Sequence, residues 1–265
     1  MKRDLLVVIK GAGEMATGVA WRLHKSHIRV LMTETHKPLA VRRAVSFCEA
    51  VYEGRMTVEG VEAILIKHPD EITKAWENSQ IPLLIDPKLK IMNNIKPDIL
   101  VEATLSKRNT GIYINDAPLV IALGPGYNAG QNAHLVVETN RGHHLGRIFE
   151  SGYAQTNTGV PGTISGFSLE RILRAPADGI FETKFVLGDS VDSGQVVATV
   201  ASEPVVAQIP GILRGFIRSG MRVKSGLKVG DIDPRGDRGY VKTISEKARA
   251  IGGSVLECIC RKYND

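Results

Sequence analysis

Short apolar runs alternate with longer amphipathic stretches through the first half of the chain. The apolar runs predict strands at residues 5–9, 28–32, 61–66, 82–85, 99–103, 119–123 and 135–138. The amphipathic stretches between them predict helices at 14–25, 69–78 and 88–95. Strands that alternate with helices form βαβ units with right-handed crossovers. We therefore expect an α/β fold with a Rossmann-like, doubly wound and mostly parallel sheet that has helices on both faces.

The second half contains an internal repeat, in which residues 175–200 and 207–232 follow one pattern at an offset of 32. The identical pairs are Ala175/Ala207, Gly179/Gly211, Ile180/Ile212, Gly188/Gly220, Val191/Val223, Ser193/Ser225, Gly194/Gly226 and Val197/Val229. Each copy predicts strands joined by glycine turns, and each needs the other to bury its apolar face. The pattern resembles the all-β barrel-sandwich hybrid module of biotinyl and lipoyl proteins. Carrier members present a lysine between the halves. The connection here, 201–206, has none, so we expect no biotin or lipoate attachment.

These patterns divide the chain into three parts. We expect a Rossmann-like domain for nucleotide or anion binding at 1–165 and the barrel-sandwich repeat domain at 172–236. The tail, 237–265, predicts a helix at 245–251 that ends at Gly252-Gly253, followed by a strand at 254–260. We expect this tail to return to the first domain and close an edge of its sheet.

Composition narrows the class of protein. The 265 residues carry a formal net charge of +6, with the basic residues dispersed and few aromatics among them. This favours a small anionic ligand or an acidic partner over nucleic acid. The longest apolar run, 5–9, is too short to span a membrane, so we expect a cytoplasmic protein without a membrane partner. Three cysteines provide no disulfide framework, and Cys258 and Cys260 would share one face of the predicted last strand.

The sharpest local motif is Gly-x-Gly-x-x-Ala between the first predicted strand and helix. Gly11 allows a tight turn, Gly13 lets the backbone approach a diphosphate, and Ala16 permits close packing of the helix on the strand. Glu34 ends the second predicted strand, where an acid accepts hydrogen bonds from ribose hydroxyls. The alternative is the same fold without a nucleotide.

A second glycine-rich loop follows the predicted strand at 119–123. Its candidate ligand residues are Gly124, Gly126, Asn128 and Gly130, whose backbone N–H groups would hold an anion. Lys107 and Asn109 follow another predicted strand and would line the same edge of the sheet. Turn geometry alone is the alternative for the glycine-rich loop, and a solvated basic loop explains Lys107 and Asn109 equally well.

A third group of polar residues extends from His134 to His144. Arg141 is a candidate anion clamp, because a guanidinium grips phosphate or carboxylate with two hydrogen bonds. Glu138 and His143 are candidate ligand contacts beside it. Imidazole and carboxylate groups suit transition metals, but their spacing here matches no zinc motif, so we predict no metal site.

Several longer motifs together resemble the YqeB family. They are 10–16 (KGAGEMA), 42–47 (RRAVSF), 124–130 (GPGYNAG), 137–143 (VETNRGH) and 230–235 (GDIDPR). YqeB proteins are encoded beside selenium-dependent molybdenum hydroxylases, and the resemblance implies a role in their maturation. The turn at 11–16 is also similar to the Rossmann domain of the XdhC family, which prepares the molybdenum cofactor of xanthine dehydrogenase.

The motifs and the resemblance together lead to one functional expectation and two alternatives. We expect an accessory protein that binds NAD, another nucleotide or a molybdopterin-type cofactor, with a molybdenum hydroxylase apoprotein or cofactor-maturation proteins as partners. The first alternative is an NAD-dependent oxidoreductase acting on a small substrate, with Lys107, His134 or His143 as its proton donor. The second is a non-catalytic adaptor between proteins. The sequence does not decide whether the chain is an enzyme.

Overall fold

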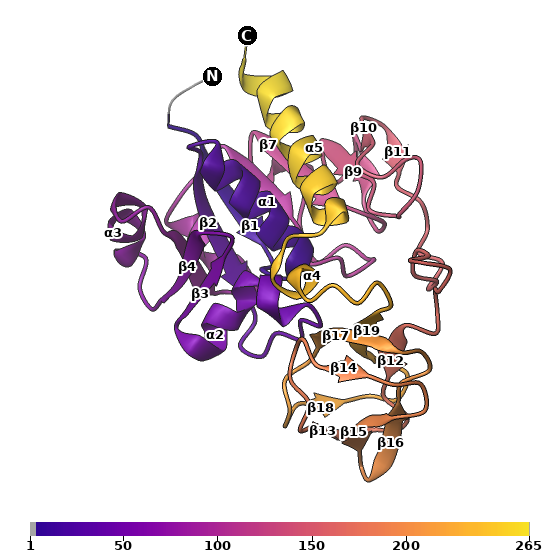
Figure 1. The fold of residues 1–265 in the computed structure, drawn as a ribbon. Helices are drawn as coiled ribbons and strands as arrows, with labels where there is room; N and C mark the ends of the chain where they lie inside the picture. Colours follow the sequence, from indigo (N-terminus) through magenta and orange to yellow (C-terminus); the bar gives the residue numbers. More distant parts are fainter. Residues whose placement is uncertain (1–3, 265) are drawn as a thin grey trace. The chain divides into compact units, whose positions relative to one another are not determined.

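The computed structural model describes residues 4–264, which form two compact units. One unit, here called the sheet unit, consists of 4–38, Ser46–Thr158 and 244–264. The other, here called the repeat unit, consists of Leu39–Val45 and Gly159–Thr243. Figure 1 shows the elements of both. No helix within residues 4–264 is long and apolar enough to span a membrane.

The sheet unit is built on one mixed sheet, which has nine strands within residues 4–264. Its parallel strands, in spatial order, are β9 (Leu135–Val137), β7 (Leu119–Leu123), β6 (Ile99–Glu102), β1 (Leu6–Lys10), β2 (Arg29–Glu34), β5 (Ile81–Ile85) and β4 (Val61–Ile66). Antiparallel strands β10 (Ile148–Phe149) and β3 (Arg55–Val58) form the two edges. The predicted strands are therefore confirmed, each within a few residues, because buried parallel strands are continuous apolar runs.

The two faces of this sheet are covered differently. Helices α1 (Glu14–Lys25) and α5 (Glu246–Tyr263) pack against each other on one face (Figure 1). The other face buries Val8, Leu31 and Leu100 against Ile72 of α3 (Glu71–Glu77) and against loops. The connections before and after β6 hold only 3-10 turns, Lys90–Asn93 and Ile114–Asp116, where a helix was predicted at 88–95. Within residues 4–264, this face thus has the crossover helix α3 between β4 and β5 but no α-helix on either side of β6.

The tail differs from the prediction. Residues 254–260 belong to α5 instead of a strand, and Gly252 and Gly253 lie within this helix. Ser245 caps it by accepting a hydrogen bond from the Ala248 N–H at 3.3 Å. Because the segment is helical, Cys258 is buried while Cys260 is partly exposed. The remaining short elements of the sheet unit are α2 (Ala50–Glu53), β8 (Asn128–Ala129) and β11 (Gly152–Tyr153).

The repeat unit consists of two four-stranded antiparallel sheets within the described residues. One has the order β12 (Ile172–Arg174), β19 (Lys228–Asp233), β17 (Gly211–Phe216) and β14 (Ser190–Val191). The other has the order β16 (Glu203–Val206), β15 (Val196–Val200), β13 (Gly179–Glu182) and β18 (Arg222–Val223). A short helix, α4 (Gly239–Lys242), follows them.

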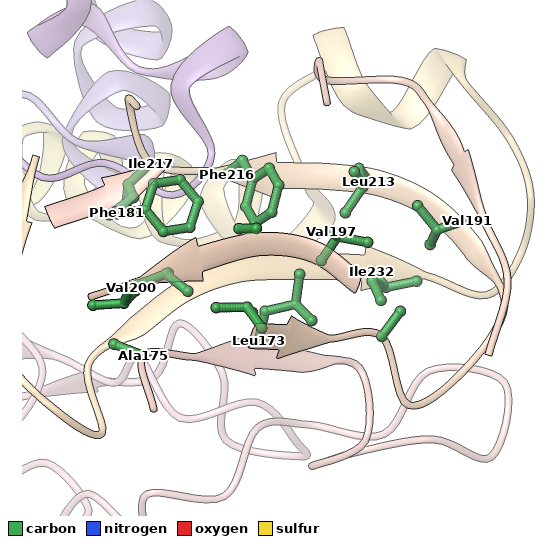
Figure 2. Close-up of a cluster of buried hydrophobic side chains, with 14 of the residues drawn as sticks. Leu173, Ala175, Phe181, Val191, Val197, Val200, Leu213, Phe216, Ile217 and Ile232 are labelled. Carbon is green, nitrogen blue, oxygen red and sulfur yellow. The ribbon is translucent and has the colours of Figure 1, made fainter. Parts of the chain in front are cut away.

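Strands of one copy of the repeat pair with strands of the other copy. Gly179 of the first copy pairs with Val223 of the second, and Gly211 of the second pairs with Val191 of the first, at the same offset. Both sheets bury their inner faces in one core, where Phe181 and Phe216 pack edge to face at 5.1 Å between ring centroids (Figure 2). Neither copy can therefore complete a sheet by itself.

These sheets correct the predicted fold class. We predicted a Rossmann-like doubly wound sheet and a barrel-sandwich module. Residues 4–264 instead form a nine-stranded mixed sheet with antiparallel edges, and a pair of four-stranded antiparallel sheets. The first prediction was wrong because apolar runs reveal the strands but not the edge pairings or the covering of each face. The second was wrong because a sequence repeat reveals equivalent strands but not which strands pair.

Candidate functional site

The first glycine motif forms a tight turn at the carboxyl end of β1. Gly11 has φ +99°, in the left-handed region that favours glycine, and a side chain there would lie 3.2 Å from the backbone of Ala103. The Gly11 N–H donates to the Thr33 carbonyl at 2.8 Å. The turn therefore joins the ends of β1, β2 and β6, and the predicted role of Gly11 in turn geometry is confirmed.

Helix α1 begins directly after this turn with an open N-terminus. Gly13 is its N-cap residue, and no side-chain hydrogen bond caps the helix within the described part of the chain. A side-chain carbon added at Gly13 would meet no heavy atom within 4 Å. Ala16, one turn further on, is fully buried. The first N–H groups of α1 and the positive end of its dipole thus adjoin open space, which is the usual arrangement for binding an anion.

Two carboxylates flank the turn. Glu34 at the end of β2 accepts hydrogen bonds from the Ala12 N–H at 2.9 Å and the Thr35 N–H at 2.7 Å. Glu34 is therefore held over the turn, with lone pairs left to accept hydroxyl groups of a ligand. Glu14 in the first turn of α1 accepts a hydrogen bond from the Ser245 hydroxyl at 2.8 Å, so its carboxylate is directed to the start of α5.

A buried polar cluster, formed by Lys10, Glu102, Thr104, Thr110 and Tyr127, lies beside the turn. Lys10 and Glu102 end the adjacent strands β1 and β6 and are register partners. The Lys10 ammonium donates to the carbonyl and the hydroxyl of Thr110 at 2.9 and 3.0 Å. The Thr104 hydroxyl donates to Glu102 Oε1, and the Tyr127 hydroxyl accepts the Thr110 N–H at 3.0 Å.

Burial controls the protonation of this cluster. It lowers the pKa of Lys10, although the charge of Glu102 acts in the opposite direction. It raises the pKa of the fully buried Glu102, although the Thr104 hydrogen bonds and Lys10 oppose it. Burial and the neighbouring Glu102 raise the pKa of Tyr127 to about 12. Burial thus disfavours the charged forms of Lys10 and Glu102. Their hydrogen bonds to Thr110 and Thr104 anchor the loop 104–110 at the carboxyl edge of the sheet.

The roles of Lys10, Glu102, Thr104 and Thr110 were not predicted from the sequence. A signal was present, because Lys10 and Glu102 are charged residues directly at the end of apolar strand runs. In open parallel sheets, ligands bind at the carboxyl ends of the strands. Only the register of β1 against β6 reveals that Lys10 and Glu102 are neighbours.

The second glycine-rich loop is closely packed. The Gly124 N–H donates to the Val137 carbonyl at 2.8 Å, and a side chain at Gly124 would lie 2.5 Å from the Thr139 hydroxyl. A side chain at Gly126 would lie 2.5 Å from the Arg108 backbone nitrogen. The structure thus brings the loop 124–126 against the loop that carries Lys107. The remaining two candidates, Asn128 and Gly130, use their backbones in a turn that closes on Ala133.

The third group of candidates is largely engaged with other protein groups. Buried Glu138 accepts the N–H groups of Asn140 and Gln155 at 2.7 and 2.8 Å. Arg141 forms an ion pair with Glu246 in the first turn of α5. His143 is exposed and contacts the ring of His144 edge to face.

Two candidates from elsewhere in the unit are also engaged. The Asn109 amide oxygen accepts the N–H groups of Gly111 and Ile112. His134 Nδ1 accepts the Val120 N–H at 3.0 Å. Among residues 4–264 there is no group of three or more His, Cys, Asp or Glu side chains that could hold a metal ion.

Comparison with known proteins yields a close sequence relative. The chain is 47% identical over 254 residues to "Uncharacterized protein YqeB" of Escherichia coli (strain K12). The match covers 96% of this chain and 47% of the relative, so the chain spans about half the length of the curated relative that it matches. The match supports the resemblance to the YqeB family. No protein-family model matches the chain.

Two solved structures resemble the chain distantly. An aspartoacylase family protein (mlr6093) of Mesorhizobium loti maff303099 has a TM-score of 0.27 and 15% identity, covering 87% of this chain and 85% of that one. A succinylglutamatedesuccinylase/aspartoacylase of Rhodobacter sphaeroides has a TM-score of 0.26 and 13% identity, covering 86% and 85%. TM-scores this low carry no inference about fold or activity.

Proposed function

We propose that this protein is an accessory factor in the maturation of a selenium-dependent molybdenum hydroxylase, and that it binds a nucleotide-bearing anionic ligand at the turn 11–13. The similarity to YqeB supports the family context, while the maturation role rests on the family resemblance. The hydroxylase apoprotein or other cofactor-maturation proteins would be its partners.

The open N-terminus of α1 behind Gly13 is the observation that carries the ligand proposal. Its N–H groups would donate to a diphosphate, and the absence of a side chain at Gly13 would let the phosphates approach the backbone. Glu34, held over the same turn, would accept the hydroxyls of a ribose. A nucleotide such as NAD and a pterin-dinucleotide cofactor both contain a diphosphate and a ribose.

The other candidate residues would assist at the same edge of the sheet. The ends of β2, β1, β6, β7 and β9 follow one another along it in that order. Lys107 beside Gly126 would add positive charge near the second loop. Arg141 would reach a ligand only by exchanging its pairing with Glu246, so its contribution would depend on competition between two anions.

Substitution of Gly13 tests the ligand site. Gly13→Ala adds one carbon where the protein itself offers no clash, so the free energy of unfolding changes by less than about 1 kcal/mol. The added carbon obstructs a diphosphate, so we expect affinity for NAD, ADP or the pterin dinucleotide to fall by about tenfold or more. Calorimetric titration of the full chain measures this.

Gly253→Ala is the matched control. A side chain at Gly253 also meets no heavy atom within 4 Å, and the residue lies in the middle of α5. We expect this variant to bind like the unchanged protein. If neither NAD, ADP nor the pterin dinucleotide binds the unchanged protein, or if both variants weaken binding equally, the ligand site is wrong.

The maturation role needs its own experiment. The hydroxylase apoprotein is co-expressed with the unchanged protein, with Gly13→Ala, with Gly253→Ala, or with none of them. We expect cofactor content and activity of the hydroxylase to be high only with the unchanged protein and with the Gly253→Ala control. A hydroxylase that matures equally well without this protein would contradict the role, whatever the outcome of the titrations.

A further inference from the structure

A row of three polar side chains crosses the sheet unit at the carboxyl ends of β2, β1 and β6. Thr33 and Glu102 are the register partners of Lys10 on its two sides. The residues two positions earlier on the same strands share one core on the face that carries α3, and they are Val8, Leu31 and Leu100. Because side chains alternate between the two faces along a strand, the three polar side chains point to this same face.

Two oxygen atoms in this row lack a hydrogen bond. Thr33 Oγ1 and Glu102 Oε2 are the only buried side-chain oxygens without a hydrogen-bond partner among residues 4–264. Both residues are fully buried. A buried oxygen without a partner costs stability, so its presence in a folded protein calls for an explanation such as a bound group. The two oxygens lie on either side of Lys10, so this cost falls on one place at the carboxyl edge of the sheet.

Lys10, between the two oxygens, has donor capacity left. Its ammonium has three hydrogens, and in the described part of the chain it donates to two acceptors, the carbonyl and the hydroxyl of Thr110. Lys10 is 7% exposed, so water reaches little of it. The row therefore offers a donor, a hydroxyl and a carboxyl oxygen to one further polar group.

The hydrogen bonds that the row does make indicate the chemistry that it binds. Lys10 holds the backbone carbonyl of Thr110 at 2.9 Å, and Glu102 Oε1 accepts the backbone N–H of Thr104 at 3.1 Å. Lys10 and Glu102 thus bind the two kinds of group that make up an amide, a carbonyl and an N–H. Both groups come from the loop 104–110, and this arrangement leaves Thr33 Oγ1 and Glu102 Oε2 unused.

The charges around Lys10 favour a neutral ligand group. The carboxyl groups that act on the Lys10 ammonium belong to Glu102, Asp116 and Asp86. An additional anion would be repelled by these acids. A neutral amide would instead offer its carbonyl to Lys10 and its N–H to the unpartnered oxygens of the row.

The loop 104–110 contains two residues in costly backbone conformations. Leu105 and Lys107 have φ +54° and +63°, in the left-handed region that favours glycine. Residues 107–109 are exposed, and the loop contains no helix or strand. Displacement of this loop would break its hydrogen bonds to Lys10 and Glu102 but release backbone strain. A ligand amide would replace the broken bonds with bonds of the same kind.

From this row we propose that Thr33, Lys10 and Glu102 bind a neutral carboxamide-type group, in which a carbonyl lies beside an N–H. Lys10 donates to the carbonyl oxygen, and the unpartnered oxygens of Thr33 and Glu102 accept the N–H. The loop 104–110 occupies the site until the ligand displaces it.

This inference rests on the proposed function, because the turn 11–13 begins at the residue after Lys10. It assigns the part of the ligand beyond the diphosphate and the ribose. NAD carries a carboxamide on its nicotinamide ring, and the pterin ring of a pterin dinucleotide contains a carbonyl beside a ring N–H. The two ligands therefore share the chemistry that the row recognises.

Thr33→Val is the first test, because valine keeps the shape of threonine and removes the unpartnered hydroxyl. The chain is titrated calorimetrically with NAD, with the pterin dinucleotide and with ADP-ribose, which keeps the diphosphate but lacks the carboxamide. We expect Thr33→Val to weaken NAD, the pterin dinucleotide or both by about fivefold to tenfold. We expect the affinity for ADP-ribose to stay within about twofold. The ligand that is weakened identifies the source of the amide.

The unfolding temperature without ligand separates a binding role from a structural one. The Thr33 hydroxyl has no partner among residues 4–264, so we expect Thr33→Val to unfold at the same or a higher temperature. Thr17→Val is the matched control, since the buried Thr17 hydroxyl donates to the Ala12 carbonyl at 3.2 Å and accepts the Phe47 N–H at 2.8 Å. We expect this control to unfold at a lower temperature.

The outcomes distinguish the row from the turn. Gly13→Ala should weaken ADP-ribose as well as the amide-bearing ligands, whereas Thr33→Val should spare ADP-ribose. The carboxamide site is wrong if ADP-ribose binds but Thr33→Val changes the affinity for neither NAD nor the pterin dinucleotide. It is also wrong if Thr33→Val lowers the unfolding temperature as much as Thr17→Val does. If none of the three ligands binds the unchanged protein, the proposed function is wrong together with this inference.

Discussion

At the scale of single residues, the Lys10–Glu102 pair shows how a parallel sheet places charge inside the protein. Each residue ends an apolar strand, and the in-register pairing of β1 with β6 brings the two together. Both residues are buried, and Glu102 Oε2 has no hydrogen-bond partner among residues 4–264. Such a pair costs stability unless it is well satisfied. Lys10 donates to Thr110 and Glu102 accepts from Thr104, so the pair positions the loop 104–110.

Glu102→Gln tests the electrostatics of this pair. The pKa of Glu102 is raised in the folded protein, so the folded state holds a proton that the unfolded state has already released. The unchanged protein therefore loses stability as the pH rises from the ordinary glutamate pKa, about 4.3, through the folded value. Glutamine does not titrate, so we expect the variant to lack this loss.

Denaturant unfolding at several pH values between about 4 and 8 measures the effect. The free energy of unfolding of Glu102→Gln relative to the unchanged protein should rise with pH across this window, by about 1.4 kcal/mol for each unit of pKa shift. A difference that stays constant with pH would mean that the pKa of Glu102 is not raised.

At the scale of elements, the contact between α1 and α5 depends on small residues. Ser245 meets Glu14, Ala248 meets Gly18, and Gly252 meets Gly18 and Arg22, so the two helices run parallel with their N-termini together. A side-chain carbon at Gly252 would lie 2.8 Å from the Gly18 carbonyl oxygen. The glycines therefore permit backbones to approach where any side chain would hold them apart.

Two adjacent glycines of α5 make a matched pair of variants. Gly252→Ala inserts a carbon into the closely packed helix contact, and we expect it to lower the free energy of unfolding by about 1–3 kcal/mol. Gly253→Ala points into open space within the same helix, and we expect a gain of about 0.5–1 kcal/mol. Thermal unfolding of both variants checks this. Equal effects on the two would show that the close contact of the helices is absent.

The same glycines explain what the sequence could reveal and what it could not. Strands such as β1 and β7 were predictable because a buried parallel strand is a continuous apolar run. The end of α5 was not, because Gly252-Gly253 is also the signal that stops a helix. Only the packing partner of Gly252, Gly18, distinguishes the two roles. The turn at Gly11 could be inferred from local geometry. The Lys10–Glu102 pair could not, because it depends on pairing between strands far apart in sequence.

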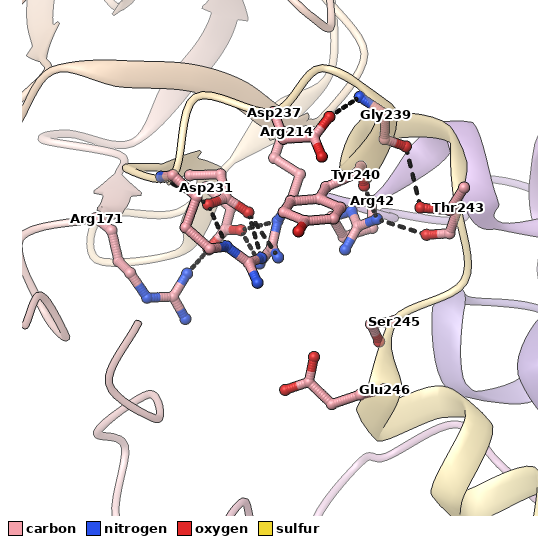
Figure 3. A network of polar contacts seen from close by, with 12 residues as sticks. Arg42, Arg171, Arg214, Asp231, Asp237, Gly239, Tyr240, Thr243, Ser245 and Glu246 are labelled. Atoms are coloured by element: carbon pink, nitrogen blue, oxygen red, sulfur yellow. Dashed lines mark hydrogen bonds and ion pairs between the residues drawn. The ribbon is translucent and has the colours of Figure 1, made fainter. Parts of the chain in front are cut away.

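At the scale of the whole molecule, the chain passes from one unit to the other after Pro38, Val45, Thr158 and Thr243. Each unit nevertheless has its own core. In the repeat unit, the short segment Leu39–Val45 is fixed through Arg42, whose guanidinium donates to the carbonyls of Tyr240 and Thr243 (Figure 3). The charged groups of the repeat unit thus contribute to its integrity.

Asp231→Ala distinguishes the two units within the intact chain. The substitution leaves buried Arg171 and Arg214 without their shared carboxylate, so we expect the repeat unit to lose about 3–5 kcal/mol of stability. In differential scanning calorimetry this loss should appear as a lower unfolding temperature for one transition.

The Asp231 pKa is depressed, so the stabilising contribution of Asp231 is present at neutral pH. It should disappear on acidification below about pH 3.9, where the unfolded-state carboxyl becomes protonated.

The nucleotide titration then reports on the sheet unit of the same variant. Gly11, Gly13 and Glu34 all belong to the sheet unit and make their contacts within it. We therefore expect Asp231→Ala to bind the nucleotide with a dissociation constant within about twofold of the unchanged protein, at a temperature where the sheet unit remains folded. If Asp231→Ala loses nucleotide binding as well as the stability of the repeat unit, the repeat unit forms part of the nucleotide site. The ligand would then have to be sought in groups from both units instead of at the turn alone.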